Sequence, residues 1–137
     1  MIAAGQLAPQ FSLYRPGDPA LIVFLETDCP TCQMALPYLN RLAGDSVRVI
    51  GVSQDPEAPT RQFIDQMRVV FPVAVDRDLA ISRAYDPPYV PALFLLDAEG
   101  RIRQAHVGFD KGALNSMAAE LGRPPVAEAY DGAPAFK

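Results

Sequence analysis

Residues 20–32 decide the fold and read Ala20-Leu21-Ile22-Val23-Phe24-Leu25-Glu26-Thr27-Asp28-Cys29-Pro30-Thr31-Cys32. The unbroken run from Ala20 to Glu26, with β-branched and aromatic residues at its centre, is typical of a strand that is buried on both faces. Pro30 then stands where a helix can begin, because a proline in the first turn gives up no hydrogen bond that the helix needs. This stretch therefore predicts a buried strand followed directly by a helix, with Cys29 and Cys32 at the junction.

Apolar runs and helical spacing alternate along the rest of the chain. They predict helices at residues 30–44, 59–68, 79–85 and 111–121, strands at residues 47–52, 71–75, 91–96 and 101–107, and a further short strand at residues 11–14. Pro37 should kink the first helix, and Asp110 and Gly122 mark the start and the end of the last one. Strands that alternate with helices lie parallel, whereas the last two strands, joined by a turn at residues 97–100, form an antiparallel hairpin. The predicted fold class is therefore α/β with a mixed sheet.

The length and composition of the chain exclude several classes of protein. Its 137 residues suit one domain, and half of them are apolar, as in a globular protein. Twelve basic and 16 acidic residues give a net charge of −4, which argues against nucleic acid and anionic membranes as partners. No apolar run approaches the roughly 20 residues of a membrane-spanning helix. Two cysteines are too few for a small protein built on several disulfides, and one histidine excludes a metal site made of several histidines.

The sequence divides into a domain at residues 1–122 and a C-terminal tail at residues 123–137. The tail is rich in small residues and is expected to be solvated. Residues 1–9 have no basic region followed by a long apolar one, so they do not form a signal peptide. The protein is accordingly expected in the cytoplasm, or in the bacterial periplasm or on the exterior of the cell envelope if a leader has been removed.

The two cysteines carry the chemistry that the sequence predicts. Unpaired N–H groups and the positive end of the helix dipole at a helix N-terminus favour a thiolate over a thiol. Cys29 is therefore the expected nucleophile of disulfide exchange, and Cys32, one turn later, the residue that resolves the mixed disulfide. A zinc site would need two more ligands, and a structural disulfide across so short a loop would add little stability, so both are less favoured. No metal or other cofactor is expected beyond the redox-active disulfide Cys29–Cys32.

Motifs along almost the whole chain, to about Gly122, resemble one known family. They are Ala8-Pro9 with Phe11, the sequence Cys29-Pro30-Thr31-Cys32, Pro37, residues 51–55 (Gly-Val-Ser-Gln-Asp), residues 85–102 and Gly108-Phe109. In this order they are similar to the thioredoxin-fold redoxin family, and within it to the TlpA/ResA-like thiol–disulfide oxidoreductases. A single C-x-x-C pair is weakly specific, whereas the ordered set is strongly specific.

The resemblance implies a thioredoxin-like fold, a three-layer α/β/α sandwich whose central mixed sheet has parallel strands and a C-terminal antiparallel hairpin. It also implies that the Val90–Pro91 bond is cis and lies against the cysteine pair. The backbone of Val90 would then pair with a substrate strand, while Pro91 would keep metal from binding between the thiols. Pro30 and Thr31 would contact the substrate and tune the redox potential.

The resemblance further implies partner proteins that offer a disulfide or a dithiol, a membrane-anchored electron donor, and action as a monomer. The Cys-Pro-Thr-Cys motif also resembles that of the thioredoxin-like reductants of cytochrome c maturation. This second likeness favours a reducing or intermediate role.

The chain departs from thioredoxin itself around the cysteines. Tryptophan is absent, and Val23 stands where thioredoxin has a buried aspartate that assists proton transfer at the resolving cysteine. Glu26 is the nearest acid on this strand, and it either takes over proton transfer or is simply an exposed carboxylate at the end of the strand. Asp28, beside Cys29, would modestly oppose a thiolate there.

Two other functions fit the sequence less well. A peroxiredoxin-like thiol peroxidase needs Pro-x-x-x-Thr/Ser-x-x-Cys, but Thr27 stands one position too close to Cys29 and Ile22 replaces the proline. A copper-binding thioredoxin-fold module carries C-x-x-x-C, one residue longer than the present spacing, together with a distant histidine. Disulfide exchange is therefore the leading hypothesis.

Overall fold

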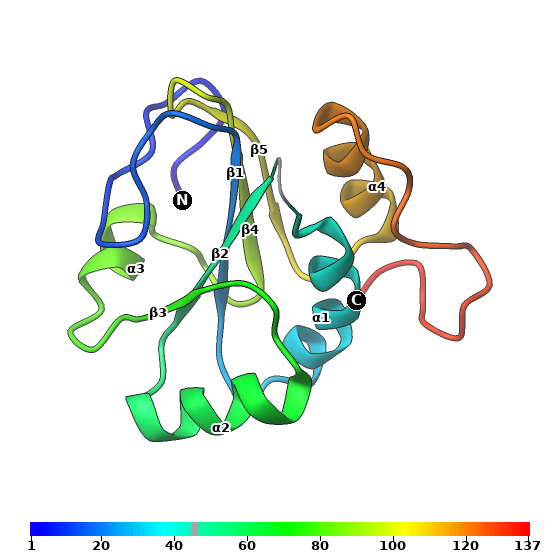
Figure 1. The fold of residues 1–137 in the computed structure, drawn as a ribbon, viewed down its shortest axis with the longest axis horizontal. Helices are drawn as coiled ribbons and strands as arrows, with labels where there is room; N and C mark the ends of the chain where they lie inside the picture. Colours follow the sequence, from blue (N-terminus) through cyan, green and yellow to red (C-terminus); the bar gives the residue numbers. More distant parts are fainter. Residues whose placement is uncertain (45–46) are drawn as a thin grey trace.

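The structure is a computed structural model that describes residues 1–44 and 47–137. In chain order its elements are β1 (Ala20–Leu25), α1 (Pro30–Leu42), β2 (Arg48–Ser53), α2 (Glu57–Met67), β3 (Val73–Val75), α3 (Ala80–Tyr85), β4 (Ala92–Leu96), β5 (Ile102–Val107) and α4 (Lys111–Glu120). The strands lie side by side in the order β3, β2, β1, β4, β5. β1, β2 and β3 run parallel, and β4 is antiparallel to both β1 and β5. Figure 1 shows α1 and α4 on one face of this sheet and α3 on the other, which gives the three layers of a thioredoxin-like α/β/α sandwich.

The predicted order of strands and helices is confirmed, with differences at the boundaries and one error. α2 begins at Glu57, two residues before its predicted start, and Pro59 fits its first turn because the first N–H groups of a helix have no partner within it. The short strand predicted at residues 11–14 is wrong. Phe11 and Tyr14 instead bond each other's backbone, at 3.1 and 3.0 Å, across a tight turn outside the sheet.

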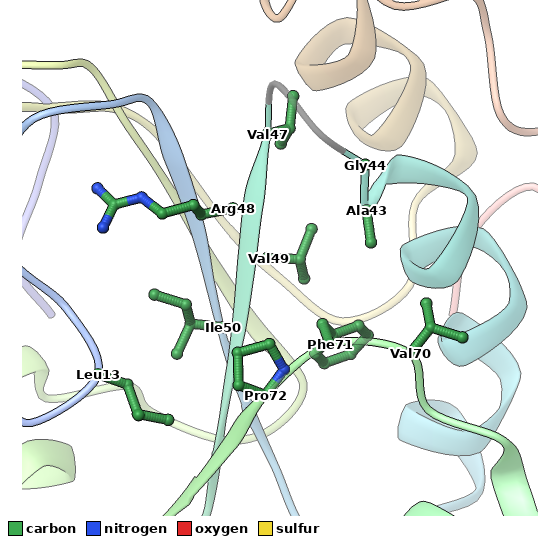
Figure 2. A pocket seen from close by; sticks show the side chains of 10 residues that line it. All are labelled: Leu13, Ala43, Gly44, Val47, Arg48, Val49, Ile50, Val70, Phe71 and Pro72. Carbon is green, nitrogen blue, oxygen red and sulfur yellow. The ribbon is translucent and has the colours of Figure 1, made fainter.

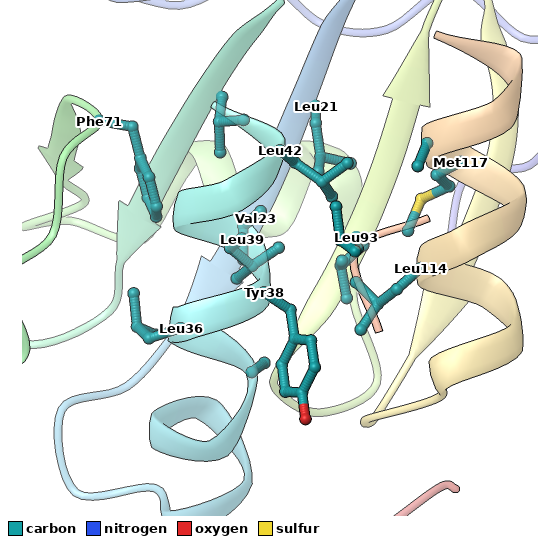
Figure 3. Packing of buried hydrophobic residues seen from close by; sticks show 14 of the residues in the cluster. Leu21, Val23, Leu36, Tyr38, Leu39, Leu42, Phe71, Leu93, Leu114 and Met117 are labelled. Carbon is teal, nitrogen blue, oxygen red and sulfur yellow. The ribbon is translucent and has the colours of Figure 1, made fainter. Parts of the chain in front are cut away.

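β1 is fully buried, and its alternate residues point to opposite faces of the sheet. Val23 lies behind α1 (Figure 3) in an apolar cluster that also contains Cys32 and residues of α4. We call this the α1 cluster. Phe24 packs on the opposite face with Tyr85 and Phe94, in what we call the α3 cluster, where the Phe24 and Tyr85 rings are 5.2 Å apart. Burial on both faces explains why this strand is an unbroken apolar run.

Residues 123–137 fold back onto the domain through a few residues, while most of the segment is exposed, as expected of a solvated tail. Val126 and Ala127 are buried in the α1 cluster. The amine of Lys111, a residue only 6% exposed, donates to the carboxylate of Asp131 at 2.6 Å and also to backbone carbonyls of this segment. A buried lysine charge must be paired, and this segment supplies its partners. The division of the chain after residue 122 stays a prediction.

Candidate active site

β1 ends at Leu25 and α1 begins at Pro30, so the cysteine pair stands at the start of a helix, as the sequence predicts. Cys29 has an extended backbone and caps the helix, since its Sγ accepts a hydrogen bond from the N–H of Cys32 at 3.1 Å. Both residues are free thiols, with Cys29 half-buried and Cys32 buried. The N–H of Cys32 is therefore placed to bind the more exposed of the two sulfur atoms.

The thiol of Cys32 has the opposite environment. Its burial raises the pKa of this thiol well above the ordinary value for cysteine, and the contact with Cys29 raises the pKa further. The backbone of Glu26 lowers the pKa of Cys32 only in part. Cys32 is therefore held as a neutral thiol in the reduced protein, out of contact with solvent.

The loop that leads into β4 faces the cysteine pair. The Val90–Pro91 peptide bond is cis, which confirms what the resemblance implies, and the carbonyl oxygen of Val90 lies 4.0 Å from Cys29 Sγ. Pro91 is buried, and its carbonyl accepts the N–H of Gly108 at 2.8 Å, which joins this loop to the end of β5. Half-buried Val90 packs against both apolar clusters. Its backbone therefore lies next to the more exposed thiol.

The other residues singled out from the sequence lie close to the pair. Pro30 and Thr31 form the first turn of α1, where Pro30 is exposed and Thr31 is half-buried. Glu26 directly follows β1 and is exposed, and the charge of its carboxylate contributes to the raised pKa of Cys32. Its position is that of an exposed carboxylate at the end of a strand, and its part in proton transfer stays a prediction.

Two residues of this site were missed by the sequence reasoning, Asp55 and Gln33. The carboxylate of Asp55 accepts the N–H of Thr27 at 2.6 Å, and the side-chain amide of Gln33 donates to the carbonyl of Thr27 at 3.1 Å. One sequence signal could have found Asp55. It follows β2 by two residues, and the ends of neighbouring parallel strands meet at one edge of a sheet.

Two hollows lie at different ends of the sheet. A groove of about 290 Å³ between Asp28 and α2 borders the redox pair, because Asp28 is the neighbour of Cys29. A second hollow, of about 430 Å³, surrounds the start of β2, and Figure 2 shows Arg48 and Phe71 on opposite sides of that strand. The cysteines lie beyond the other end of β1 and β2, so the first groove is the one relevant to their chemistry. Within the described residues, no three His, Cys, Asp or Glu side chains are grouped so that they could hold a metal ion.

A C-x-x-C pair at the N-terminus of a helix, facing a cis-proline loop in a thioredoxin-like sheet, defines a class of dithiol proteins. Residues 3–121 match the model of the Redoxin family, and the chain belongs to this family. Its family, fold and cysteine pair make it a thiol–disulfide oxidoreductase of the ResA/DsbE type.

Similarity to known proteins agrees with this assignment. The chain is 29% identical over 110 residues to the thiol-disulfide oxidoreductase ResA of Halalkalibacterium halodurans. This match covers 77% of this chain and 61% of that protein. The chain is 31% identical over 99 residues to the thiol:disulfide interchange protein DsbE of Yersinia pestis, with 71% of this chain and 53% of that protein covered. The matches thus span between about half and three-fifths of these two relatives.

A solved structure shows the same fold. It is the crystal structure of a secreted Mycobacterium tuberculosis disulfide oxidoreductase, described as homologous to E. coli DsbE. The two structures superpose with a TM-score of 0.67 at 22% identity, covering 77% of this chain and 83% of that one.

Proposed function

We propose that this protein exchanges disulfides with partner proteins through Cys29 as the nucleophile and Cys32 as the resolving cysteine. The asymmetry of the pair carries this proposal. Cys29 is partly exposed and its Sγ accepts the N–H of Cys32 at 3.1 Å, whereas Cys32 is buried and the pKa of its thiol is raised. Because the thiolate is the attacking species in disulfide exchange, an outside sulfur meets Cys29 first.

The exchange proceeds in two steps. In the reducing direction, the thiolate of Cys29 attacks one sulfur of the partner's disulfide, a mixed disulfide forms, and the partner's other sulfur leaves as a thiolate and takes up a proton. Cys32 then loses its proton and attacks Cys29 Sγ, which releases the partner's second sulfur and leaves the Cys29–Cys32 disulfide. The partner gains two electrons and the protein loses two, and the oxidising direction is the reverse.

The surroundings of the pair suggest how the other residues take part. An extended substrate segment would pair with the backbone of Val90, whose carbonyl lies 4.0 Å from Cys29 Sγ. Pro30 and Thr31 would contact that segment, and Pro91 would exclude metal from the thiols. Glu26 would accept the proton that Cys32 loses in the second step.

The ResA- and DsbE-type relatives imply protein partners that offer a dithiol or a disulfide. We further propose a membrane-anchored electron donor, action as a monomer, and a location in the periplasm or on the exterior of the cell envelope. The secreted structural relative supports this location. None of the helices in residues 1–44 and 47–137 combines the length and the apolar character needed to cross a membrane.

Trapping with single-cysteine variants tests the two roles. We expect Cys32→Ser to accumulate a mixed disulfide with a disulfide-containing peptide, because the first step occurs without the second. Cys29→Ser should form none and should lose insulin reduction. Non-reducing electrophoresis and mass spectrometry measure the adduct. A Cys29→Ser variant that still reduces insulin would contradict the proposal, and sulfenic acid at Cys29 with rapid peroxide consumption would indicate a peroxidase instead.

The midpoint potential of the Cys29–Cys32 pair in a glutathione or dithiothreitol buffer tests the direction. A value near about −270 mV would indicate a thioredoxin-like reductant, and one near about −120 mV an oxidant of the DsbA kind. The Cys-Pro-Thr-Cys motif favours the first of these or an intermediate value.

A further inference from the structure

Two side chains hold the loop between β1 and α1, one through the N–H of Thr27 and the other through its carbonyl. The N–H of Thr27 donates to Asp55 Oδ2 at 2.6 Å, and its carbonyl accepts the side-chain amide of Gln33 at 3.1 Å. The backbone N–H of Gln33 also donates to the carbonyl of Cys29, at 3.0 Å. These contacts fix the segment just before Cys29 relative to both β2 and α1.

The backbone of Asp55 is held by hydrogen bonds that do not involve its carboxylate. Its N–H donates to Ser53 Oγ at 3.2 Å, and its carbonyl accepts the hydroxyl of Thr60 at 3.3 Å. Ser53 and Thr60 are buried, and their hydroxyls bond each other at 2.6 Å. The side chain of Asp55 therefore reaches the redox loop from a fixed backbone, which should remain in place when the carboxylate is removed.

We propose that Asp55 is a positioning residue for disulfide exchange. Its carboxylate holds the peptide of Thr27, and in this way it fixes the loop that presents Cys29 Sγ to the N–H of Cys32 and to the partner's sulfur. Asp55 itself makes and breaks no covalent bond. A small displacement of a reacting atom slows a reaction strongly, so loss of this contact should lower the rate. The inference rests on the proposed role of Cys29.

Two substitutions separate positioning from charge. Asp55→Asn keeps an acceptor oxygen for the N–H of Thr27 and removes the negative charge, whereas Asp55→Ala removes both. If Asp55 positions the loop, the Asn variant should react like the original protein. If Asp55 acts through its charge on the thiols, the Asn and Ala variants should resemble each other.

The experiment measures the second-order rate of the reduced protein with a peptide disulfide, together with the midpoint potential of the Cys29–Cys32 pair. We expect Asp55→Ala to react about tenfold more slowly and to have a more negative potential, because the reduced form loses the ordered contact between Cys29 Sγ and the N–H of Cys32. Asp55→Asn should stay within about twofold of the original rate and keep its potential.

Asp97 offers a matched control. Its Oδ1 also accepts backbone N–H groups, those of Glu99 and Arg101 at 3.0 and 2.9 Å, but in the turn between β4 and β5 at the far end of the sheet. Asp97→Ala should therefore change the stability of the protein and leave the exchange rate and the potential unchanged.

Failure of this inference is distinguishable from failure of the proposed function. Cys29→Ser, measured in the same assay, should lose the reaction entirely, whereas Asp55→Ala should slow it. An Asp55→Ala variant with the original rate, or an Asp55→Asn variant as slow as Asp55→Ala, would overturn the positioning role. If Asp55→Ala does not fold, Gln33→Ala removes the second contact with Thr27 from an exposed helix position, and an unchanged rate in that variant would overturn the role.

Discussion

Cys29 and Cys32 are three positions apart in the sequence, yet their sulfur atoms have different surroundings. Cys32 lies within the α1 cluster, and Cys29 lies at its margin, next to Val90. The difference arises because one helical turn is enough to carry a side chain from the exposed start of α1 into the core. The chemistry of each thiol therefore follows from its depth as well as from its place in the motif.

This difference predicts selective labelling of the reduced protein. At about pH 7, iodoacetamide should modify Cys29 and leave Cys32 unmodified, because burial raises the pKa of the Cys32 thiol and only the thiolate reacts. Since the pKa is raised, the thiolate of Cys32 should appear only well above the value of about 8.5 for an exposed cysteine. Mass spectrometry after alkylation at increasing pH measures this. Protein unfolded in urea serves as the control and should be labelled twice, and double labelling of the folded protein at neutral pH would contradict the prediction.

At the scale of the elements, the start of α4 shows how a local sequence signal becomes structure. Asp110 precedes the helix with an extended backbone, and its Oδ1 accepts the N–H of Ala113 at 3.0 Å. This N-cap was predicted from the sequence because aspartate satisfies an N–H group that the helix leaves unpaired. The cap therefore stabilises the helix that carries buried Lys111.

Removing this cap should destabilise the protein. We expect Asp110→Ala to lower the free energy of unfolding by about 1 kcal/mol, and Asp110→Asn, which keeps an acceptor oxygen, to lower it much less. Urea unfolding of the reduced proteins measures both. An Ala variant as stable as the original protein would show that the hydrogen bond to Ala113 contributes little.

The order of strands and helices could be predicted because each one carries its own pattern. The run in β1, the prolines near helix starts and the cap at Asp110 act over a few residues. The cysteine pair could likewise be predicted from its local motif, whereas the cis bond before Pro91 was implied by the family resemblance. The place of Asp55 just after β2 indicated the edge of the sheet where it lies, but its contact with Thr27 joins two loops separated by 28 positions and has no local signal.

The contacts that join the C-terminal segment to the domain could not be predicted, for the same physical reason. Val126 and Ala127 form too short an apolar stretch to show a strand or helix period, and prolines precede them. The segment is held by the charge of Lys111. From the sequence alone, Lys111 would be expected to be an ordinary exposed residue of a helix. Its amine finds its partners only when the C-terminal segment folds over the start of α4.

At the scale of the whole molecule, Asp131 joins the C-terminal segment to two helices. Its carboxylate accepts the amine of Lys111 in α4 at 2.6 Å and the hydroxyl of Tyr38 in α1 at 2.5 Å. The bond from Lys111, followed by that from Tyr38, holds the pKa of Asp131 well below its ordinary value. These contacts keep residues 123–137 against the domain.

The lowered pKa of Asp131 predicts a dependence of stability on pH. A depressed pKa in the folded state means that the contribution of Asp131 is present above its unfolded value of about 3.9 and is lost as the pH falls below it. Asp131→Asn should therefore be less stable than the original protein at about pH 7, and the difference should shrink between about pH 4 and 2. Urea midpoints at a series of pH values measure it. A difference that stays constant to the lowest pH would contradict the ionic role of Asp131.

The two apolar clusters have a consequence for how this protein can change over evolutionary time. Among the described residues, Cys29 and Cys32 pack with the α1 cluster, whereas Val90 packs with both clusters. Substitutions around Tyr85 and Phe94 that leave Val90 in place should therefore alter heat tolerance more than the reactivity of the thiols. Selection for temperature and selection for partner chemistry can thus act on opposite faces of one sheet, and engineering for heat resistance should begin on the face that carries α3.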